Sequence, residues 1–174
     1  MVAHHSPTSA VLAPGELVEA LAYRAAAAGR ASRVTRFASR TTVAAALVVR
    51  RDRVAAHARS QRGKPYRWGA SGPEAYDCSG LALRSYAVGG RKLPRTAAAQ
   101  SRLGRPIPRR LVRPGDLVYW GGRGSAYHVG VVVKVTGPSG RLRVWVADAP
   151  GSGRRVTVRH PWPGGGHRFA RLIG

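Results

Sequence analysis

The chain has 174 residues, which is enough for one domain with a hydrophobic core and an additional extension. Lysine and arginine total 30 against 7 aspartates and glutamates, and the formal net charge is +23 at pH 7. Such a charge predicts attraction to polyanions, which include nucleic acid, anionic membranes and the anionic polymers of a bacterial wall. The single cysteine excludes an internal disulfide and a cysteine-based metal cluster. No apolar run approaches the ~20 residues of a membrane span.

Residues 1–50 form a basic extension rich in alanine and arginine, which we expect to be partly helical or disordered. Residues 16–28 contain strong helix formers. The apolar run 41–49 is too short, and lies too deep in the chain, for a signal peptide. The pair His4-His5 is too short to indicate a metal site. The alternative for this extension is a basic helix that contacts a membrane or wall surface.

A second region, residues 52–174, has the pattern of a folded domain. Asp52 is a candidate N-cap for a helix that Gly63 ends. A second helix is expected to begin at Cys78 and to end at Gly89-Gly90, and a third covers 96–103. Strands are expected at 117–120, 129–135, 142–147, 156–159 and 169–173. Helices come first and an antiparallel meander follows, so the predicted fold class is α+β, with N-terminal helices packed on an antiparallel β-sheet.

The lone cysteine, Cys78, lies where a glycine-rich loop turns into a helix. A thiol in the first helical turn lies near unpaired N–H groups and the positive end of the dipole, which favour its thiolate form. Cys78 is therefore a candidate nucleophile. The alternative is a buried structural cysteine without a chemical role.

A cysteine nucleophile needs a base, and the base needs an orienting group. His128 is the candidate base because it opens the most strongly predicted strand. Asp148 is the candidate orienting group because it ends the partner strand, at the same rim of the sheet. The alternatives are a rim histidine without a role and an aspartate that only forms a turn. The remaining histidines of this region are expected to be solvated: His57, His160 and His167.

Five motifs follow one another along the chain, at 63–69 (GKPYRWG), 77–81 (DCSGL), 93–96 (LPRT), 113–117 (RPGDL) and 128–131 (HVGV). Together, and in this order, they resemble the NlpC/P60 family of cell-wall cysteine peptidases. The resemblance implies a papain-like fold and hydrolysis of peptidoglycan stem peptides, typically between γ-D-glutamate and a diamino acid. It requires no metal or cofactor.

The resemblance also implies roles for individual residues. Cys78 matches the nucleophile and His128 the base. Tyr66 matches a tyrosine that lies beside the cysteine. Asp77 and Ser79 match positions that help to hold the amine end of the stem peptide.

The chain departs from the family pattern in three places. Residues 68–70 read Trp-Gly-Ala where a double glycine is more usual. The third catalytic position, commonly histidine, falls on Asp148, and some relatives carry an acid there. The hairpin between His128 and Asp148 is longer than usual, with 136–143 as the insertion.

These observations predict a monomeric peptidoglycan hydrolase in the cell envelope or secreted, although no signal peptide is recognisable. Its partners would be stem peptides and, through the basic surface, anionic wall polymers. Two alternatives remain open. One is a non-enzymatic polyanion-binding protein, although no specific nucleic-acid motif is present. The other is an amidase or acyltransferase of the same fold that acts on another amide.

Overall fold

The computed structural model describes residues 39–138, 141–161 and 166–173. The helix expected at 16–28 and the pair His4-His5 lie outside these residues. The chain divides into two compact units, Met1–Ala44 and Ala45–Gly174. The second unit contains all the helices, strands and site residues described below, apart from the first residues of one helix. Within the described residues, no helix combines the length and apolar character needed to cross a membrane.

The first described element is a helix over residues 39–60, so the expected helix start at Asp52 is wrong. No glycine or proline interrupts this stretch, and Asp52 is an exposed residue inside the helix. The second half of the helix buries Val54, Ala55 and Ala58. Arg50 donates from Nε to the carbonyl of Gly89 at 2.9 Å, which connects this helix to the end of the next one.

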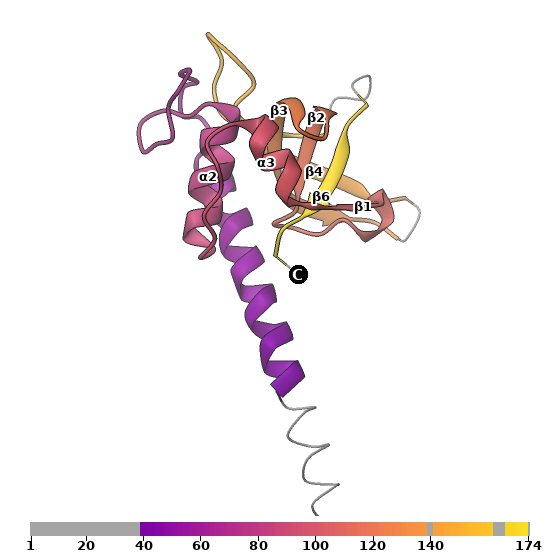
Figure 1. Ribbon diagram of the computed structural model, residues 1–174. Coiled ribbons are helices and arrows are strands. Elements are labelled where there is room, and N and C mark those ends of the chain that lie inside the picture. Colours follow the sequence, from indigo (N-terminus) through magenta and orange to yellow (C-terminus); the bar gives the residue numbers. More distant parts are fainter. Residues whose placement is uncertain (1–38, 139–140, 162–165, 174) are drawn as a thin grey trace, which may run out of the picture. The chain divides into compact units, whose positions relative to one another are not determined.

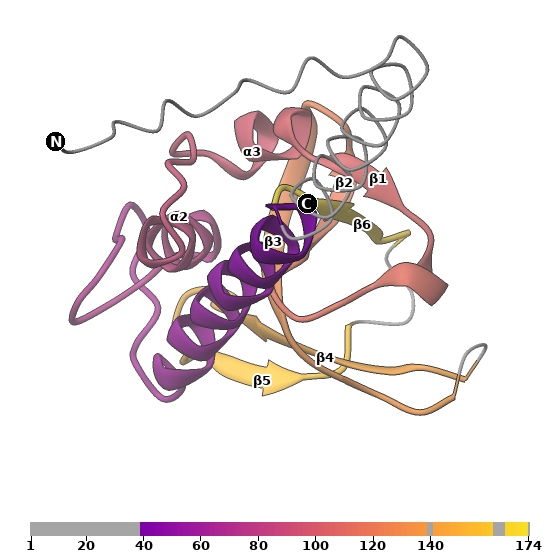
Figure 2. The same ribbon diagram turned by 90° about the horizontal axis from the view of Figure 1, so that it is seen from below.

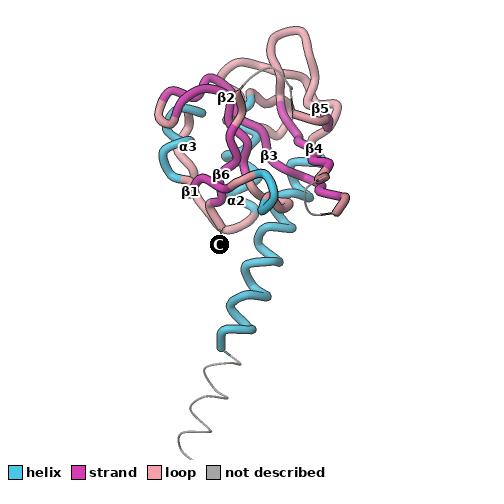
Figure 3. The backbone as a smooth tube through the Cα atoms, turned by 90° about the vertical axis from the view of Figure 1, so that its right-hand side faces the viewer, coloured by secondary structure: helices cyan, strands magenta, loops and turns pink. Residues whose placement is uncertain are grey.

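Six strands form one antiparallel sheet in the order β1-β6-β2-β3-β4-β5. Figure 3 shows β1 and β6 on one side of β3, and β4 and β5 on the other. Their bounds are β1 Arg105–Ile107, β2 Leu117–Gly122, β3 Ser125–Thr136, β4 Arg143–Asp148, β5 Thr157–Arg159 and β6 Arg168–Arg171. The α+β prediction and the five expected strands are confirmed, while β1 and a short 3-10 helix, η1 (Arg109–Leu111), were not expected.

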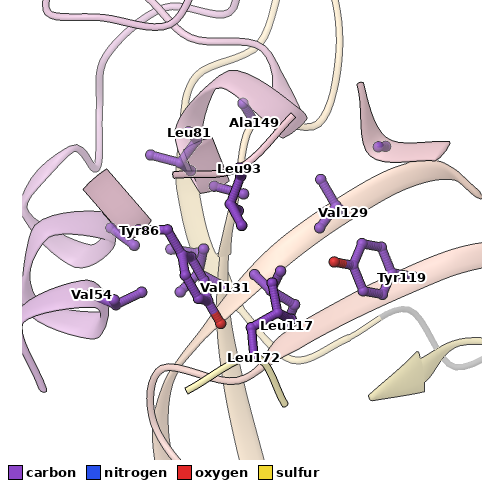
Figure 4. Close-up of a cluster of buried hydrophobic side chains, with 14 of the residues drawn as sticks. Val54, Leu81, Tyr86, Leu93, Leu117, Tyr119, Val129, Val131, Ala149 and Leu172 are labelled. Carbon is purple, nitrogen blue, oxygen red and sulfur yellow. The ribbon is translucent and has the colours of Figure 1, made fainter. Parts of the chain in front are cut away.

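Helices α2 (Cys78–Val88) and α3 (Ala97–Leu103) both pack on β3 (Figures 1 and 2). α3 begins one residue after the expected start at 96, because Thr96 is the N-cap and its side chain accepts a hydrogen bond from Ala99 N. Alternate residues of β2 face opposite sides of the sheet. Leu117 and Tyr119 therefore belong to the core beneath the helices (Figure 4), and Val118 and Trp120 belong to a second cluster. The sheet is thus covered by apolar contacts on both faces, which fixes its register.

Candidate active site

Asp77 defines the start of α2. Its carboxylate accepts from Gly80 N at 2.7 Å and from Gly69 N at 2.9 Å. Arg95 forms a salt bridge with the same carboxylate, with Nη1 at 3.0 Å from Oδ1, and also donates to Ser79 Oγ at 2.9 Å. Burial would raise the pKa of Asp77, but these donors outweigh it and hold the pKa below its ordinary value. The helix therefore begins at Cys78, with an ionised cap beneath it.

Two neighbours fix the first turn of α2. A Cβ on Gly80 would lie 2.1 Å from the carbonyl oxygen of Ala70, so only glycine lets the preceding loop approach this closely. Gln100 of α3 donates from Nε2 to the carbonyl oxygen of Ser79 at 2.9 Å. Cys78, which lies between these contacts, is only partly buried and is therefore accessible.

His128 lies inside β3 rather than at its start, and it pairs with Trp120 of β2. Its ring packs on the indole, with centroids 5.0 Å apart, and the residue is only 6% exposed. The ring Nε2 lies 2.9 Å from Asp148 Oδ2, which leaves Nδ1 as the nitrogen available to the thiol. Gly130, two residues further along β3, lets the Val146 side chain of β4 pack closely against the strand. A Cβ there would lie 2.3 Å from Val146 and 3.4 Å from the Cβ of Asp148.

The electrostatics of His128 favour a charged ring. Burial would lower the pKa of His128, but hydrogen bonds to Asp148 and Cys78 outweigh burial and raise the pKa to about 9. At neutral pH this histidine therefore favours the imidazolium form beside the Cys78 side chain.

Asp148 ends β4, as expected, and is 1% exposed. Besides His128 it contacts Arg159 of β5, which donates from Nη2 to Oδ2 at 2.7 Å and from Nε to Oδ1 at 3.3 Å. The structure thus brings Cys78, His128 and Asp148 together and adds an arginine that the sequence did not indicate.

A groove of about 450 Å³ opens over Cys78. Asp77 and Ser79 contribute to its lining, but their polar groups also contact Arg95, a contact that the sequence did not indicate. Trp68 and Tyr127, the large aromatic residues of the groove, are 85% and 68% exposed.

Tyr66 is half-buried. Burial raises its pKa, and the nearby Cys78 and Asp77 raise it further.

Two of the other three histidines, His57 and His167, differ from expectation. His57 is half-buried, with Nδ1 3.0 Å from Ser85 Oγ, so its predicted solvation is wrong. His160 is exposed but packs on Trp145, with ring centroids 4.6 Å apart. His167 is half-buried and contacts Trp120 and Phe169. All three are separate from the contacts of Cys78 described above.

Comparison with known proteins agrees with this geometry. A model of the NlpC/P60 family matches residues 63–159. The chain is 43% identical over 74 residues to the "Probable endopeptidase Cgl2188" of Corynebacterium glutamicum, a match that covers 42% of this chain and 34% of the relative. It is 37% identical over 110 residues to the "Peptidoglycan endopeptidase RipA" of Mycobacterium tuberculosis, covering 54% of this chain and 23% of RipA. The matched part is thus about a third or less of the length of either relative.

A solved structure has a similar fold. RipD of Mycobacterium tuberculosis, described as "a non-catalytic NlpC/p60 domain protein", has a TM-score of 0.56 and 28% identity. The match covers 71% of this chain and 98% of that one. Since the family match extends over more than half of the sequence and includes Cys78, His128 and Asp148, the chain belongs to the NlpC/P60 family.

Proposed function

We propose that the protein is a cysteine endopeptidase that hydrolyses an amide bond in peptidoglycan stem peptides. The observation that carries this proposal is the His128 ring, held by Asp148 at 2.9 Å and hydrogen-bonded to the thiol of Cys78 at the start of a helix. A protein that only binds polyanions needs neither a buried histidine–carboxylate pair nor an accessible thiol beside it.

The proposed chemistry begins with attack of the Cys78 thiolate on the amide carbonyl. Gly80 N and Leu81 N already donate to Asp77, so the oxyanion would be bound by the N–H groups of Cys78 and Ser79. The His128 imidazolium protonates the leaving amine as the C–N bond breaks. Water then attacks the thioester, neutral His128 takes its proton, and the acid product and thiolate are released.

The groove supports a peptide substrate. It exposes two aromatic side chains and one arginine near the thiol, and its remaining lining is formed by small residues. The proposed bond is the one between γ-D-glutamate and the diamino acid, in line with the family resemblance. Asp77 and Ser79 are proposed to contact the amine end of the stem peptide from positions that Arg95 also holds.

The charge of +23 supports an additional attraction to anionic wall polymers. We propose that this attraction concentrates the enzyme on its insoluble substrate, outside the cytoplasm.

Hydrolysis of purified muropeptides, followed by mass spectrometry, tests the proposal. The proposed enzyme produces two fragments separated at one amide bond, and the Cys78→Ala variant produces none. A second candidate, peptidoglycan binding without hydrolysis, is favoured by the similarity to RipD. Wild-type protein that binds muropeptides but leaves them intact would establish that alternative.

A further inference from the structure

The Asp148 carboxylate is bound from two sides. Oδ2 lies 2.9 Å from His128 Nε2 and 2.7 Å from Arg159 Nη2, and Oδ1 lies 3.3 Å from Arg159 Nε. The side chain of Asp148 is 2% exposed and that of Arg159 is 29% exposed. Arg159 does not line the groove over Cys78. Its described contact with the site is the one with Asp148.

The register between β4 and β5 produces this contact. Asp148 pairs with Thr157 and Val146 pairs with Arg159. Arg159 lies two residues beyond Thr157, on the same face of the strand, and such diagonal neighbours are within reach of a long side chain. The last residue of a three-residue strand thus reaches the last residue of its neighbour.

The charges of His128, Asp148 and Arg159 depend on one another. When His128 is protonated, the carboxylate lies between an imidazolium and a guanidinium. An arginine fork fixes both the plane and the direction of a carboxylate, which a single point contact does not. If a neutral or basic side chain replaced Asp148, the two cations would face each other without an anion between them.

We propose that Arg159 is a positioning residue: it fixes Asp148 against His128 and restricts the third catalytic position to an acid. This inference rests on the proposed function, in which Cys78 and His128 carry the hydrolysis.

The first test is kinetic and uses soluble muropeptides as substrate. Arg159→Gln is expected to lower kcat about tenfold, the equivalent of one lost charge-assisted hydrogen bond, with KM unchanged because Arg159 does not touch the groove. Arg159→Lys is expected to recover part of this loss, since it keeps the charge but not the fork. An unchanged kcat in a folded Arg159→Gln protein would overturn the proposal.

The chain offers a matched control in Arg171, which forms a similar fork with Asp116 at 2.9 and 2.8 Å, within the other half of the sheet. Arg171→Gln removes the same type of contact and is expected to lower the melting temperature but not kcat. If it fails to fold, Arg171→Lys replaces it. Equal losses of kcat at Arg159 and Arg171 would show a purely structural effect and would also overturn the proposal.

The second test concerns the selection of an acid. Asp148→His is expected to be nearly inactive while Arg159 is present. Asp148→His/Arg159→Gln is expected to be about tenfold faster than Asp148→His, because the guanidinium no longer faces the histidine at position 148. Equal rates in the two backgrounds would contradict the selection of an acid by Arg159.

Labelling of Cys78 by iodoacetamide separates this inference from the proposed function. If wild-type protein does not cleave muropeptides, the proposed function fails, but the labelling rate at pH 7 still reports the thiolate that His128 stabilises. The proposal then requires slower labelling in Arg159→Gln than in Arg171→Gln, and equal rates refute it.

Discussion

Replacement of Asp148 tests the site most informatively, because its carboxylate contacts both the proposed base and an arginine. Asp148→Ala leaves the His128 ring without the contact at 2.9 Å and leaves Arg159 without its fork. The ring loses the partner that holds its tautomer and stabilises its charge, so we expect kcat to fall about 1,000-fold or more.

The burial of this ion pair also sets the loss of stability that we expect in Asp148→Ala. Breaking a buried ion pair by removing one partner typically costs 3–5 kcal/mol. Because Arg159 is 29% exposed and can turn toward solvent, we expect about 3 kcal/mol for Asp148→Ala. Asp148→Asn keeps the shape but places an amide N–H₂ against one of the donors, so its kcat and stability are expected to lie between alanine and wild type.

The assay measures kcat on muropeptides and the free energy of unfolding for each variant. Asp116→Ala is the control, since Asp116 is equally buried and pairs with Arg171, within the other half of the sheet. It is expected to cost similar stability with little change in kcat. A folded Asp148→Ala protein with near-normal kcat would remove Asp148 from the site and refute this reasoning.

Three further predictions concern the first turn of α2, the charge of His128 and the net charge of the protein. Gly80→Ala forces a Cβ to within 2.1 Å of the Ala70 carbonyl oxygen. We therefore expect about 2 kcal/mol lower stability and slower hydrolysis. A melting temperature equal to that of the wild type would contradict this close approach. The pKa of His128 is raised to about 9 from an ordinary 6.5, so its contribution of about 3 kcal/mol is fully present below pH 6.5 and is lost as pH rises through 9. The difference in unfolding free energy between wild type and His128→Asn should shrink over that range, and a constant difference would refute the charged ring. Binding to wall fragments should weaken steeply with salt, because the attraction of a +23 protein is screened over ~8 Å at physiological ionic strength; salt-independent binding would exclude it.

Much of this site could be predicted from local sequence. The position of Cys78 follows from a loop-former stretch and a helical pattern, both within a few residues. His128 and Asp148 follow from adjacent strands whose β-branched residues are easily recognised. The start of α3 near Thr96 was similarly local.

The rest depends on long-range pairing that no local pattern contains. Arg159 reaches Asp148 only through the β4–β5 register, and β6 lies next to β2 only through a crossover. The third catalytic position is commonly histidine in the family that the sequence resembles, but the contact between Arg159 and Asp148 leads us to expect a poor histidine variant here. The helix start at Asp52 was wrong because a cap residue is only a weak signal when strong helix formers precede it.

The proposed hydrolysis requires Cys78 to act as a nucleophile that His128 activates. The most direct measurement is mass spectrometry of wild type and Cys78→Ala after incubation with purified muropeptides, with intact-protein spectra to detect an acyl group on the enzyme. The account predicts cleavage at one amide bond by wild type, a transient thioester adduct on Cys78, and neither in Cys78→Ala. Cleavage at a similar rate by a folded Cys78→Ala protein would contradict it.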